Sequence, residues 1–385
     1  MIGAPVAHPP RPAPPVVASP HAHQVSFGAV WGTVDRRTRR VSIRIGTKVV
    51  ARERVRRGRY AFSLKLPRRD FALRVTAIGR GGRASTSVAP VFGLPRRASP
   101  VRRAGYKKPA LQRRLRRMVR RYRGVGAFYV KDLTTGAGAA WNAAARFPAA
   151  STLKLAIAVE VLRSIRGGPP HAHSYVGSLV SKMLRWSDNR AANALLGTVG
   201  GGWRVDATMQ ALGLRDSLMF GGYLPGTRPP PLRRMSTDVR RRRRAPIPIE
   251  VVQQPSFGLG KYSSAHDLGR LVSLVHLAAG RKGALVHGFR GWFTVADARY
   301  LLFELAHVSD PGKLGRYLHG GGTAVLHKAG WIHSARHDNG LVYWPGGVFV
   351  ATVMTWNPSG TGASSDVLAG RAARAALRIF RHLRR

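Results

Sequence analysis

The 385-residue sequence has no cysteine, few acidic side chains and no long apolar run. Without cysteine the chain can form no disulfide, no thiolate nucleophile and no cysteine-ligated zinc site. No apolar run approaches the roughly 18 residues of a membrane-spanning helix, so we expect no transmembrane segment. The chain is long enough for two domains, each with its own core.

The shortage of acidic residues leaves a net charge of +49, from 65 Lys and Arg against 16 Asp and Glu. Such a charge attracts polyanions, and an anionic wall polymer is a candidate partner. Alternatively, the arginines are a compositional bias spread over solvated surfaces, since only Arg240 to Arg244 forms an uninterrupted run. That run lies among prolines and predicts a loop. No basic motif interleaved with aromatic residues occurs, so no specific nucleic-acid partner is expected.

Metal chemistry is not expected either. The 14 histidines are scattered, and no His-Glu-x-x-His motif occurs. His171 and His173 could bind a metal adventitiously, but a polar loop is the better explanation. We therefore expect no metal site and no other cofactor.

Residues 1–24 are rich in Pro, Ala and His and predict a disordered segment. They lack the basic start and the apolar stretch of a signal peptide. Either the protein stays inside the cell or its natural start lies upstream of Met1, and the sequence leaves both possibilities open.

Residues 25–92 predict a small β-sandwich. Apolar and polar residues alternate in 41–45, 60–66 and 71–77, and Gly and Pro separate these segments, which is typical of strands with one buried face. The segment resembles a bacterial immunoglobulin-like module with a role as a spacer or in wall adhesion; the alternative is a β domain without a ligand. Residues 93–108, rich in Pro and Arg, predict a linker.

Residues 109–385 predict a second domain with strands at both ends and helices between them. Apolar residues at helical spacing follow Pro109, and a similar face recurs near the C-terminus. The expected elements are a helix from Pro109, strands 125–133 and 139–142, a hairpin of 341–344 and 348–356, and a closing helix over 365–383.

Ser151 and Lys154 stand at the start of an expected helix whose following residues are apolar nearly all round. At positions i and i+3 the two side chains share one face of the helix. Burial lowers the pKa of a lysine, so Lys154 could accept the proton of a nucleophilic Ser151. The alternative is a capping serine followed by a surface lysine, although an apolar helix gives Lys154 little access to water.

Two further motifs follow. Ser187-Asp188-Asn189 comes after an amphipathic helix over 176–186, and all three residues are also good helix N-caps. Lys328-Ala329-Gly330-Trp331 lies on an expected strand.

In this order the motifs match the three-part signature of active-site serine penicillin-recognising enzymes, and the chain resembles class A β-lactamases from about residue 111 to the end. The resemblance implies an α+β fold, with an antiparallel sheet flanked by helices and an inserted helical subdomain. Only one short loop, 166–174, separates the first two motif helices, which implies a trimmed subdomain.

The resemblance also implies roles for the motif residues. Ser187 would pass a proton to the leaving nitrogen, Asn189 would bind the substrate amide and Lys154, and Asp188 would brace the loop. Lys328 would attract a substrate carboxylate and assist the proton relay. Gly330 would allow close approach of the substrate, and the main-chain N–H of Trp331 would complete an oxyanion hole with that of Ser151.

The sequence departs from the family in two places. Ala329 stands where the family has a hydroxyl that contacts the substrate carboxylate; His333, Arg336 or His337 could replace that contact, or could lie on a solvated turn. The family's Glu-x-x-Leu-Asn, whose Glu activates the hydrolytic water, is absent. Glu250 is the single glutamate between Gly221 and Gly260 and is a plausible substitute by position, although its surroundings differ from the motif.

The resemblance implies a serine hydrolase that opens β-lactam amides through a Ser151 acyl-enzyme, in an extracellular or cell-envelope location. A peptidoglycan D,D-carboxypeptidase or penicillin-binding-protein-like wall enzyme is the alternative, since without a deacylation base the acyl-enzyme would persist. A third hypothesis is an inactive, polyanion-binding envelope protein that retains the fold. The small-molecule partner is accordingly a β-lactam or a peptidoglycan peptide.

Overall fold

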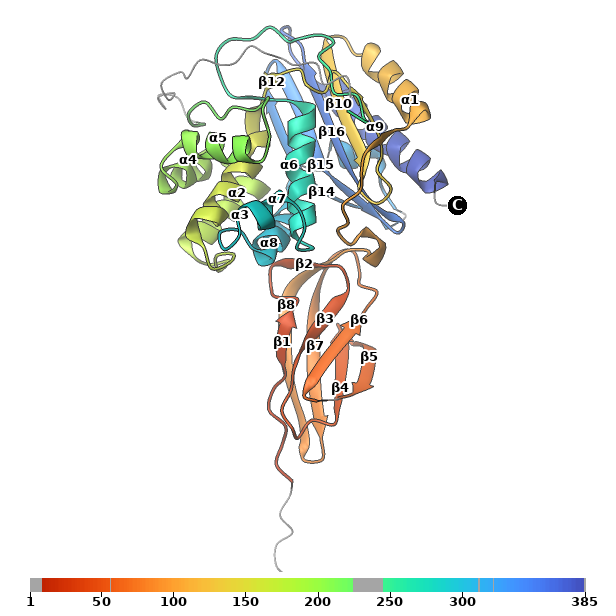
Figure 1. The fold of residues 1–385 in the computed structure, drawn as a ribbon, viewed down its shortest axis with the longest axis vertical. Coiled ribbons are helices and arrows are strands. Elements are labelled where there is room, and N and C mark those ends of the chain that lie inside the picture. The colour runs from red at the N-terminus through yellow and green to blue at the C-terminus, as the bar shows by residue number, and fades with distance from the viewer. Residues whose placement is uncertain (1–8, 56, 224–244, 311, 321, 384–385) are drawn as a thin grey trace, which may run out of the picture. The chain divides into compact units, whose positions relative to one another are not determined.

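The structure is a computed structural model that describes residues 9–55, 57–223, 245–310, 312–320 and 322–383. The chain divides into two compact units, Met1–Arg96 and Arg97–Arg385 (Figure 1). The run Arg240 to Arg244 lies outside the described residues. Within them, every helix is too short or too polar to cross a bilayer.

The first unit contains two sheets. Val41, Ile43, Leu73 and Val75 are completely buried and pack with Phe62 in one core, as the alternating pattern requires. The structure therefore has the expected small β-sandwich. Its three-stranded sheet has the order β1 (Val16–Ser19), β3 (Ala29–Thr33), β6 (Arg59–Ser63), and its five-stranded sheet the order β2 (Gln24–Ser26), β8 (Gly82–Gly93), β7 (Asp70–Gly79), β4 (Arg40–Ile45), β5 (Lys48–Arg54).

Two boundaries differ from the expectation. Strand β1 pairs with β3, so the prediction of disorder throughout residues 1–24 is wrong for this part. The expected linker 93–108 contains a short helix, η1 (Arg96–Ala98), and strand β9 (Tyr106–Lys107), which pairs with β11. Both β1 and β9 are edge strands, which tolerate the nearby prolines because half of their main-chain groups need no partner strand.

The second unit is built on a six-stranded sheet with strands from both ends of the domain. Val125 pairs with Trp356 and Asp132 with Phe349, so a strand from the N-terminal part of the unit lies in the middle of the sheet beside the last strand. This confirms the predicted α+β fold. The order is β14 (Ala324–Ile332), β15 (Ala335–Trp344), β16 (Gly347–Trp356), β10 (Val125–Asp132), β11 (Ala137–Trp141), β9.

Helices cover both faces of this sheet (Figure 1). Helices α1 (Pro109–Arg120) and α9 (Ala363–His382) lie on one face, where Phe128 and Val130 contribute to the shared core. On the other face lie α6 (Ala265–Ala278) and α8 (Val295–Ala306), and the first and last predicted helices are thereby confirmed.

The inserted helical subdomain positions the motif residues. Helix α2 is buried from Lys154 to Leu162, as expected for an apolar helix, and residues 166–174 alone connect it to α3. The remaining elements are η2 (Ala150–Leu153), α2 (Lys154–Ile165), α3 (Tyr175–Arg185), α4 (Asn189–Thr198), α5 (Gly202–Ala211), α7 (Ala284–Gly288), η3 (Leu314–Tyr317) and the strand pair β12 (Phe147–Pro148) and β13 (Tyr262–Ser263).

Two helical glycines test the packing of α6 on the sheet. A Cβ atom at Gly269 would lie 2.6 Å from the ring of Tyr129 and 3.0 Å from Thr352, whereas one at Gly197 in α4 would meet nothing within 4 Å. We expect Gly269→Ala to lower the free energy of unfolding by about 1–3 kcal/mol and Gly197→Ala to raise it by roughly 0.5 kcal/mol. Urea unfolding followed by tryptophan fluorescence measures both, and a Gly269→Ala protein as stable as the wild type would contradict this packing.

Candidate active site

Ser151 lies in the short helix η2, directly before α2, and is partly exposed. The preceding residue, Ala150, has a φ of 47°, a left-handed conformation that costs a non-glycine residue free energy. Strand β14 packs directly against the same turn: a Cβ atom at Gly330 would lie 2.7 Å from the main-chain nitrogen of Ser151. Glycine is therefore needed at position 330 to bring this strand against the Ser151 turn.

Lys154 is completely buried at the first turn of α2. Its Nζ donates to the carbonyl oxygen of Ser187 at 2.5 Å and to Oδ1 of Asn189 at 2.6 Å, and lies 3.4 Å from the Ser187 hydroxyl. Burial, followed by the positive charge of Lys328, lowers the pKa of Lys154 to about 7. A substantial fraction of this amine is therefore neutral near pH 7 and can accept a proton.

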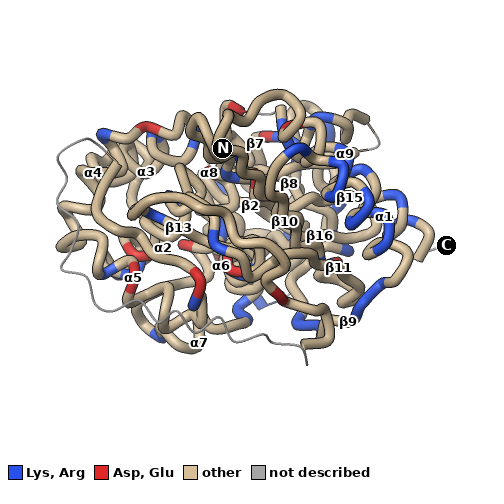
Figure 2. Tube along the Cα trace, turned by 90° about the horizontal axis from the view of Figure 1, so that it is seen from above, with Lys and Arg blue, Asp and Glu red and all other residues tan. Residues whose placement is uncertain are grey.

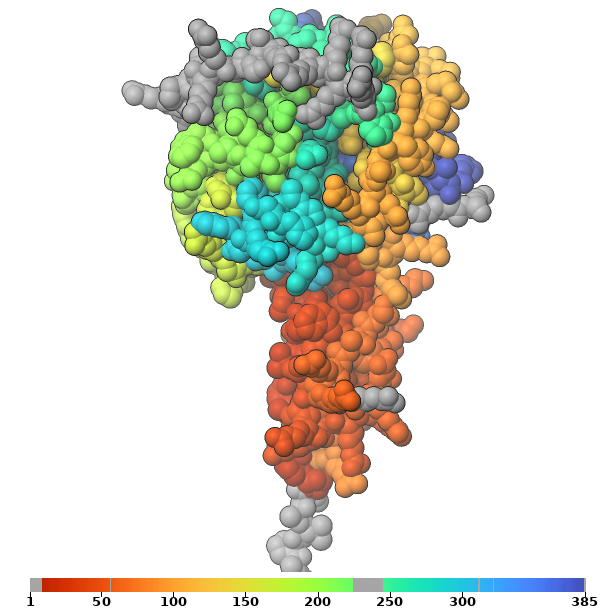
Figure 3. Space-filling model, in the orientation of Figure 1, coloured from red at the N-terminus to blue at the C-terminus, as the bar shows by residue number. Residues whose placement is uncertain are grey.

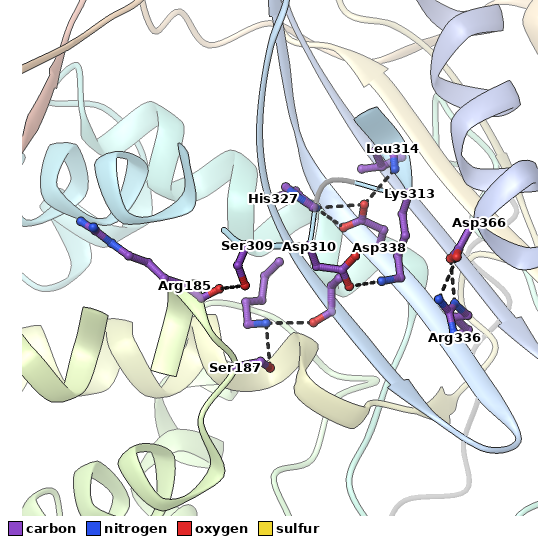
Figure 4. Close-up of polar contacts among 12 residues, drawn as sticks. Arg185, Ser187, Ser309, Asp310, Lys313, Leu314, His327, Arg336, Asp338 and Asp366 are labelled. Atoms are coloured by element: carbon purple, nitrogen blue, oxygen red, sulfur yellow. Dashed lines mark hydrogen bonds and ion pairs between the residues drawn. The ribbon is translucent and has the colours of Figure 1, made fainter. Parts of the chain in front are cut away.

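Ser187 connects Lys154 with Lys328. Its φ of 60° places it in the left-handed region, so that its carbonyl oxygen accepts from Lys154 while its hydroxyl accepts from Nζ of Lys328 at 3.0 Å. Figure 4 shows Ser187 below the ammonium group that bonds to it. This hydroxyl lies between two amines and can transfer a proton in either direction.

Asp188 and Asn189 have different structural roles. The carboxylate of Asp188 accepts from the main-chain N–H of Ala191 at 2.8 Å and caps α4. Asn189, the first residue of α4, turns its side chain to Lys154. The tripeptide is thus both a helix cap and part of the lysine site, so the two interpretations of the sequence are compatible.

Lys328 is buried on β14, and its Nζ also donates to the carbonyl oxygen of Ala329 at 3.0 Å. Burial lowers its pKa to about 8, while the carboxylates of Asp338 and Asp310 oppose the shift. Asp338 contacts the ring of His327 at 2.8 Å and accepts from the N–H of Leu314 (Figure 4). The carboxylates of Asp338 and Asp310 thus favour the positively charged form of Lys328.

Two of the three residues that could replace the missing anion contact, Arg336 and His337, are engaged elsewhere. Arg336 makes two bonds to Asp366, at 2.7 and 2.8 Å, and His337 is buried against the carbonyl oxygen of Pro148, with its pKa lowered by burial to about 4. The prediction is therefore wrong for these two residues. His333 is exposed on the hairpin turn, and the Trp331 side chain is 63% exposed beside the site.

Glu250 contacts a different part of the domain. Its carbonyl oxygen accepts from the N–H of Ala144, on the connection between β11 and β12. Within the described part of the chain, no hydrogen bond or ion pair links its carboxylate to Ser151, Lys154 or Ser187. Its role as a deacylation base stays a prediction.

Two residues that belong to no motif complete the site. The ring centre of Tyr223 lies 4.6 Å from Nζ of Lys154 and 4.6 Å from Nζ of Lys261. Tyr223 lies in the stretch that departs from the family and Lys261 directly follows it, so no spacing rule could select them. The one signal in the sequence was a lysine in a chain whose basic residues are mostly arginine.

No metal is implied by the geometry. The described residues contain no group of three or more His, Asp and Glu side chains that could hold an ion.

The pH dependence of stability tests the burial of Lys154. Its pKa falls from 10.5 to about 7 on folding, so between these values the unfolded chain holds a proton that the folded chain has released. Stability should therefore rise with pH from 7 to 10, by up to about 1.4 kcal/mol per pH unit, relative to Lys154→Met. Urea unfolding at several pH values measures this, with the exposed Lys182→Met as control; parallel curves for wild type and Lys154→Met would exclude a depressed pKa.

Comparison with known proteins agrees with this geometry. The profile of the "Beta-lactamase enzyme family" matches residues 110–174 and 164–380. No curated protein matches. Similar solved structures include PBP-A (19% identity, 73% of this chain and 100% of that one, TM-score 0.54) and a β-lactamase from Sphaerobacter thermophilus (20%, 71% and 97%, 0.51). An ancestral class A β-lactamase is also similar (19%, 70% and 100%, 0.51). The chain belongs to the β-lactamase enzyme family.

Proposed function

We propose that this protein opens β-lactam amides through an acyl-enzyme on Ser151 and releases the product slowly. The observation that carries the proposal is the buried Lys154, held by Ser187 and Asn189 one helical turn from Ser151, with a pKa near neutrality. A neutral amine at this place is the base that a serine nucleophile needs.

The proposed acylation follows from these positions. The Ser151 oxygen forms a bond to the amide carbon, and its proton moves to Lys154. The main-chain N–H groups of Ser151 and Trp331 bind the developing oxyanion. As the carbon–nitrogen bond breaks, the proton passes through the Ser187 hydroxyl, next to Lys328, to the leaving nitrogen. Lys328 also supplies the positive charge for a substrate carboxylate.

We base the proposed slow release of the product on the side chains that surround Ser151 and Lys154. Among the described residues, neither side chain forms a hydrogen bond or an ion pair with a carboxylate, and Asp188 is engaged as a helix cap. A water molecule that attacks the ester would therefore find no carboxylate base held beside Ser151 or Lys154 by the described residues. This favours the alternative of a penicillin-binding-protein-like D,D-peptidase, whose physiological substrate would be a peptidoglycan peptide in the cell envelope. The solved acyl-enzyme of a PBP-A variant with penicillin G shows the same kind of adduct in a protein of this fold.

A time course of intact mass with penicillin G tests the proposal. We expect the wild type to gain one penicillin mass that persists for minutes or longer, Ser151→Ala to gain none, and Lys154→Met to react at least about 100-fold more slowly, since a positioned base contributes roughly this factor.

Glu250→Gln serves as the control for deacylation. We expect its adduct to last as long as that of the wild type; a longer-lived adduct would identify Glu250 as the base. Rapid loss of the wild-type adduct would indicate a β-lactamase, and no Ser151-dependent adduct would exclude the proposed activity.

An anionic wall polymer is the second proposed partner. Arg114, Arg117, Arg121, Arg123 and Arg371 line a groove between α1 and α9, and within the described chain no ion pair engages any of them. Figure 2 shows basic positions gathered along these two helices, and Figure 3 shows their surfaces side by side. Guanidinium groups in such a row match repeated phosphates on a linear polymer.

Charge-matched variants test this partner. Binding to an immobilised phosphodiester polymer is measured against salt for a groove triple (Arg114, Arg117 and Arg371 to Gln) and a control triple on the first unit (Arg44, Arg52 and Arg74 to Gln). We expect the groove triple to bind at least about tenfold more weakly and to reduce the salt slope by roughly one for each phosphate that is no longer neutralised. If both triple variants lost binding to the polymer equally, the binding would depend on the total charge and not on a defined groove.

A further inference from the structure

Tyr223 contacts three parts of the site at once. Its hydroxyl donates to the carbonyl oxygen of Ala150 at 3.1 Å, in the strained residue directly before Ser151. Its main-chain N–H donates to Oδ1 of Asn193 at 2.7 Å, one turn along α4 from Asn189. The residue therefore joins the Ser151 turn to the helix that carries Asn189.

The ring of Tyr223 lies against two lysines. Nζ of Lys154 and Nζ of Lys261 are each 4.6 Å from its centre. Lys261 is itself fixed, because its Nζ donates to the carbonyl oxygen of Gly222 at 2.6 Å and its own carbonyl oxygen accepts from the N–H of Ala149 at 2.8 Å. The aromatic ring thus occupies space beside Lys154 that solvent would otherwise fill.

The segment before Tyr223 is tied down over its length. Leu218 pairs with Tyr262, and the N–H of Met219 donates to Asp206 at 2.6 Å. Phe220 has a φ of 44°, a strained conformation that the neighbouring bonds maintain. These contacts hold the backbone that presents the ring to Lys154.

We infer that Tyr223 is a positioning residue, whose ring, lying between the Ser151 turn and α4, shields Lys154 from bulk water. This deepens the proposed function and, in its effect on the acyl-enzyme, rests on it. The same ring that keeps water from Lys154 also keeps it from an ester on Ser151, so one side chain would favour acylation and delay deacylation.

The charges around Lys154 set the direction of the effect. Lys328 from β14 and Lys261 repel its proton, Asp188 attracts it, and burial is the largest cause of its lowered pKa. An aromatic face attracts an ammonium ion, but full hydration stabilises the ion more. Removal of the ring should therefore raise the pKa of Lys154.

The test compares Tyr223→Ala with Tyr223→Phe, which keeps the ring and removes only the hydroxyl. Carbon-13-labelled lysine gives one Cε signal for each of the eleven lysines, and Lys154→Arg identifies that of Lys154. We expect the pKa of Lys154 to rise from about 7 by one unit or more in Tyr223→Ala and to stay within about 0.3 units in Tyr223→Phe. Should the Ala protein fail to fold, Tyr223→Val replaces it with the same expected direction.

An unchanged or lower pKa in the variant without the ring would overturn the inference. The titration needs no substrate, so it decides the role of Tyr223 even if no penicillin adduct forms, in which case the proposed function alone would fail. Where the adduct forms, its lifetime should shorten several-fold in Tyr223→Ala and remain unchanged in Tyr223→Phe; an unchanged lifetime in Tyr223→Ala would also overturn the shielding role.

Discussion

The proposed active site depends on an amine that is buried and can still release its proton. Arginine cannot serve, because its guanidinium stays charged in proteins. Of the 65 basic residues only eleven are lysines, and three of them, Lys154, Lys261 and Lys328, meet around Ser187 and Tyr223. Although arginine carries most of the positive charge of the chain, the three basic residues that meet here are lysines, whose amines can release a proton.

Burial of this amine constrains the elements around it. An ammonium ion in an apolar helix needs acceptors, and the left-handed Ser187 and the N-terminus of α4 supply a carbonyl and an amide oxygen. Strand β14 must then come close enough for Lys328 to reach the Ser187 hydroxyl, which Gly330 permits. The strained backbone at Ala150, Ser187 and Phe220 lies within this arrangement, where the surrounding bonds can offset its free-energy cost.

The sequence predicted the parts of this arrangement that repeat locally. Alternation located β4, β6 and β7 of the first unit, the helical period located α1 and α9, and three short motifs located Ser151, Ser187 and Lys328. It could not predict β1 and β9, because an edge strand with prolines lacks the usual pattern, nor the pairing of Arg336 with Asp366, 30 residues away. Tyr223 and Lys261 were missed for the same reason: only the fold brings residues of the divergent stretch to Lys154.

The two half-reactions of an acyl-enzyme make opposite demands on water. Acylation gains from its exclusion, since desolvation lowers the pKa of Lys154, whereas deacylation requires a water molecule and a base beside the ester. In the described site, buried lysines and an aromatic ring exclude water, as acylation requires. No carboxylate among the described residues is held beside Ser151 or Lys154 to activate the water that deacylation requires. For the proposed acyl-enzyme, the rate of product release would depend on how far the ring and the residues around it admit water, so acylation and turnover could change independently while Ser151, Lys154 and Ser187 stay the same.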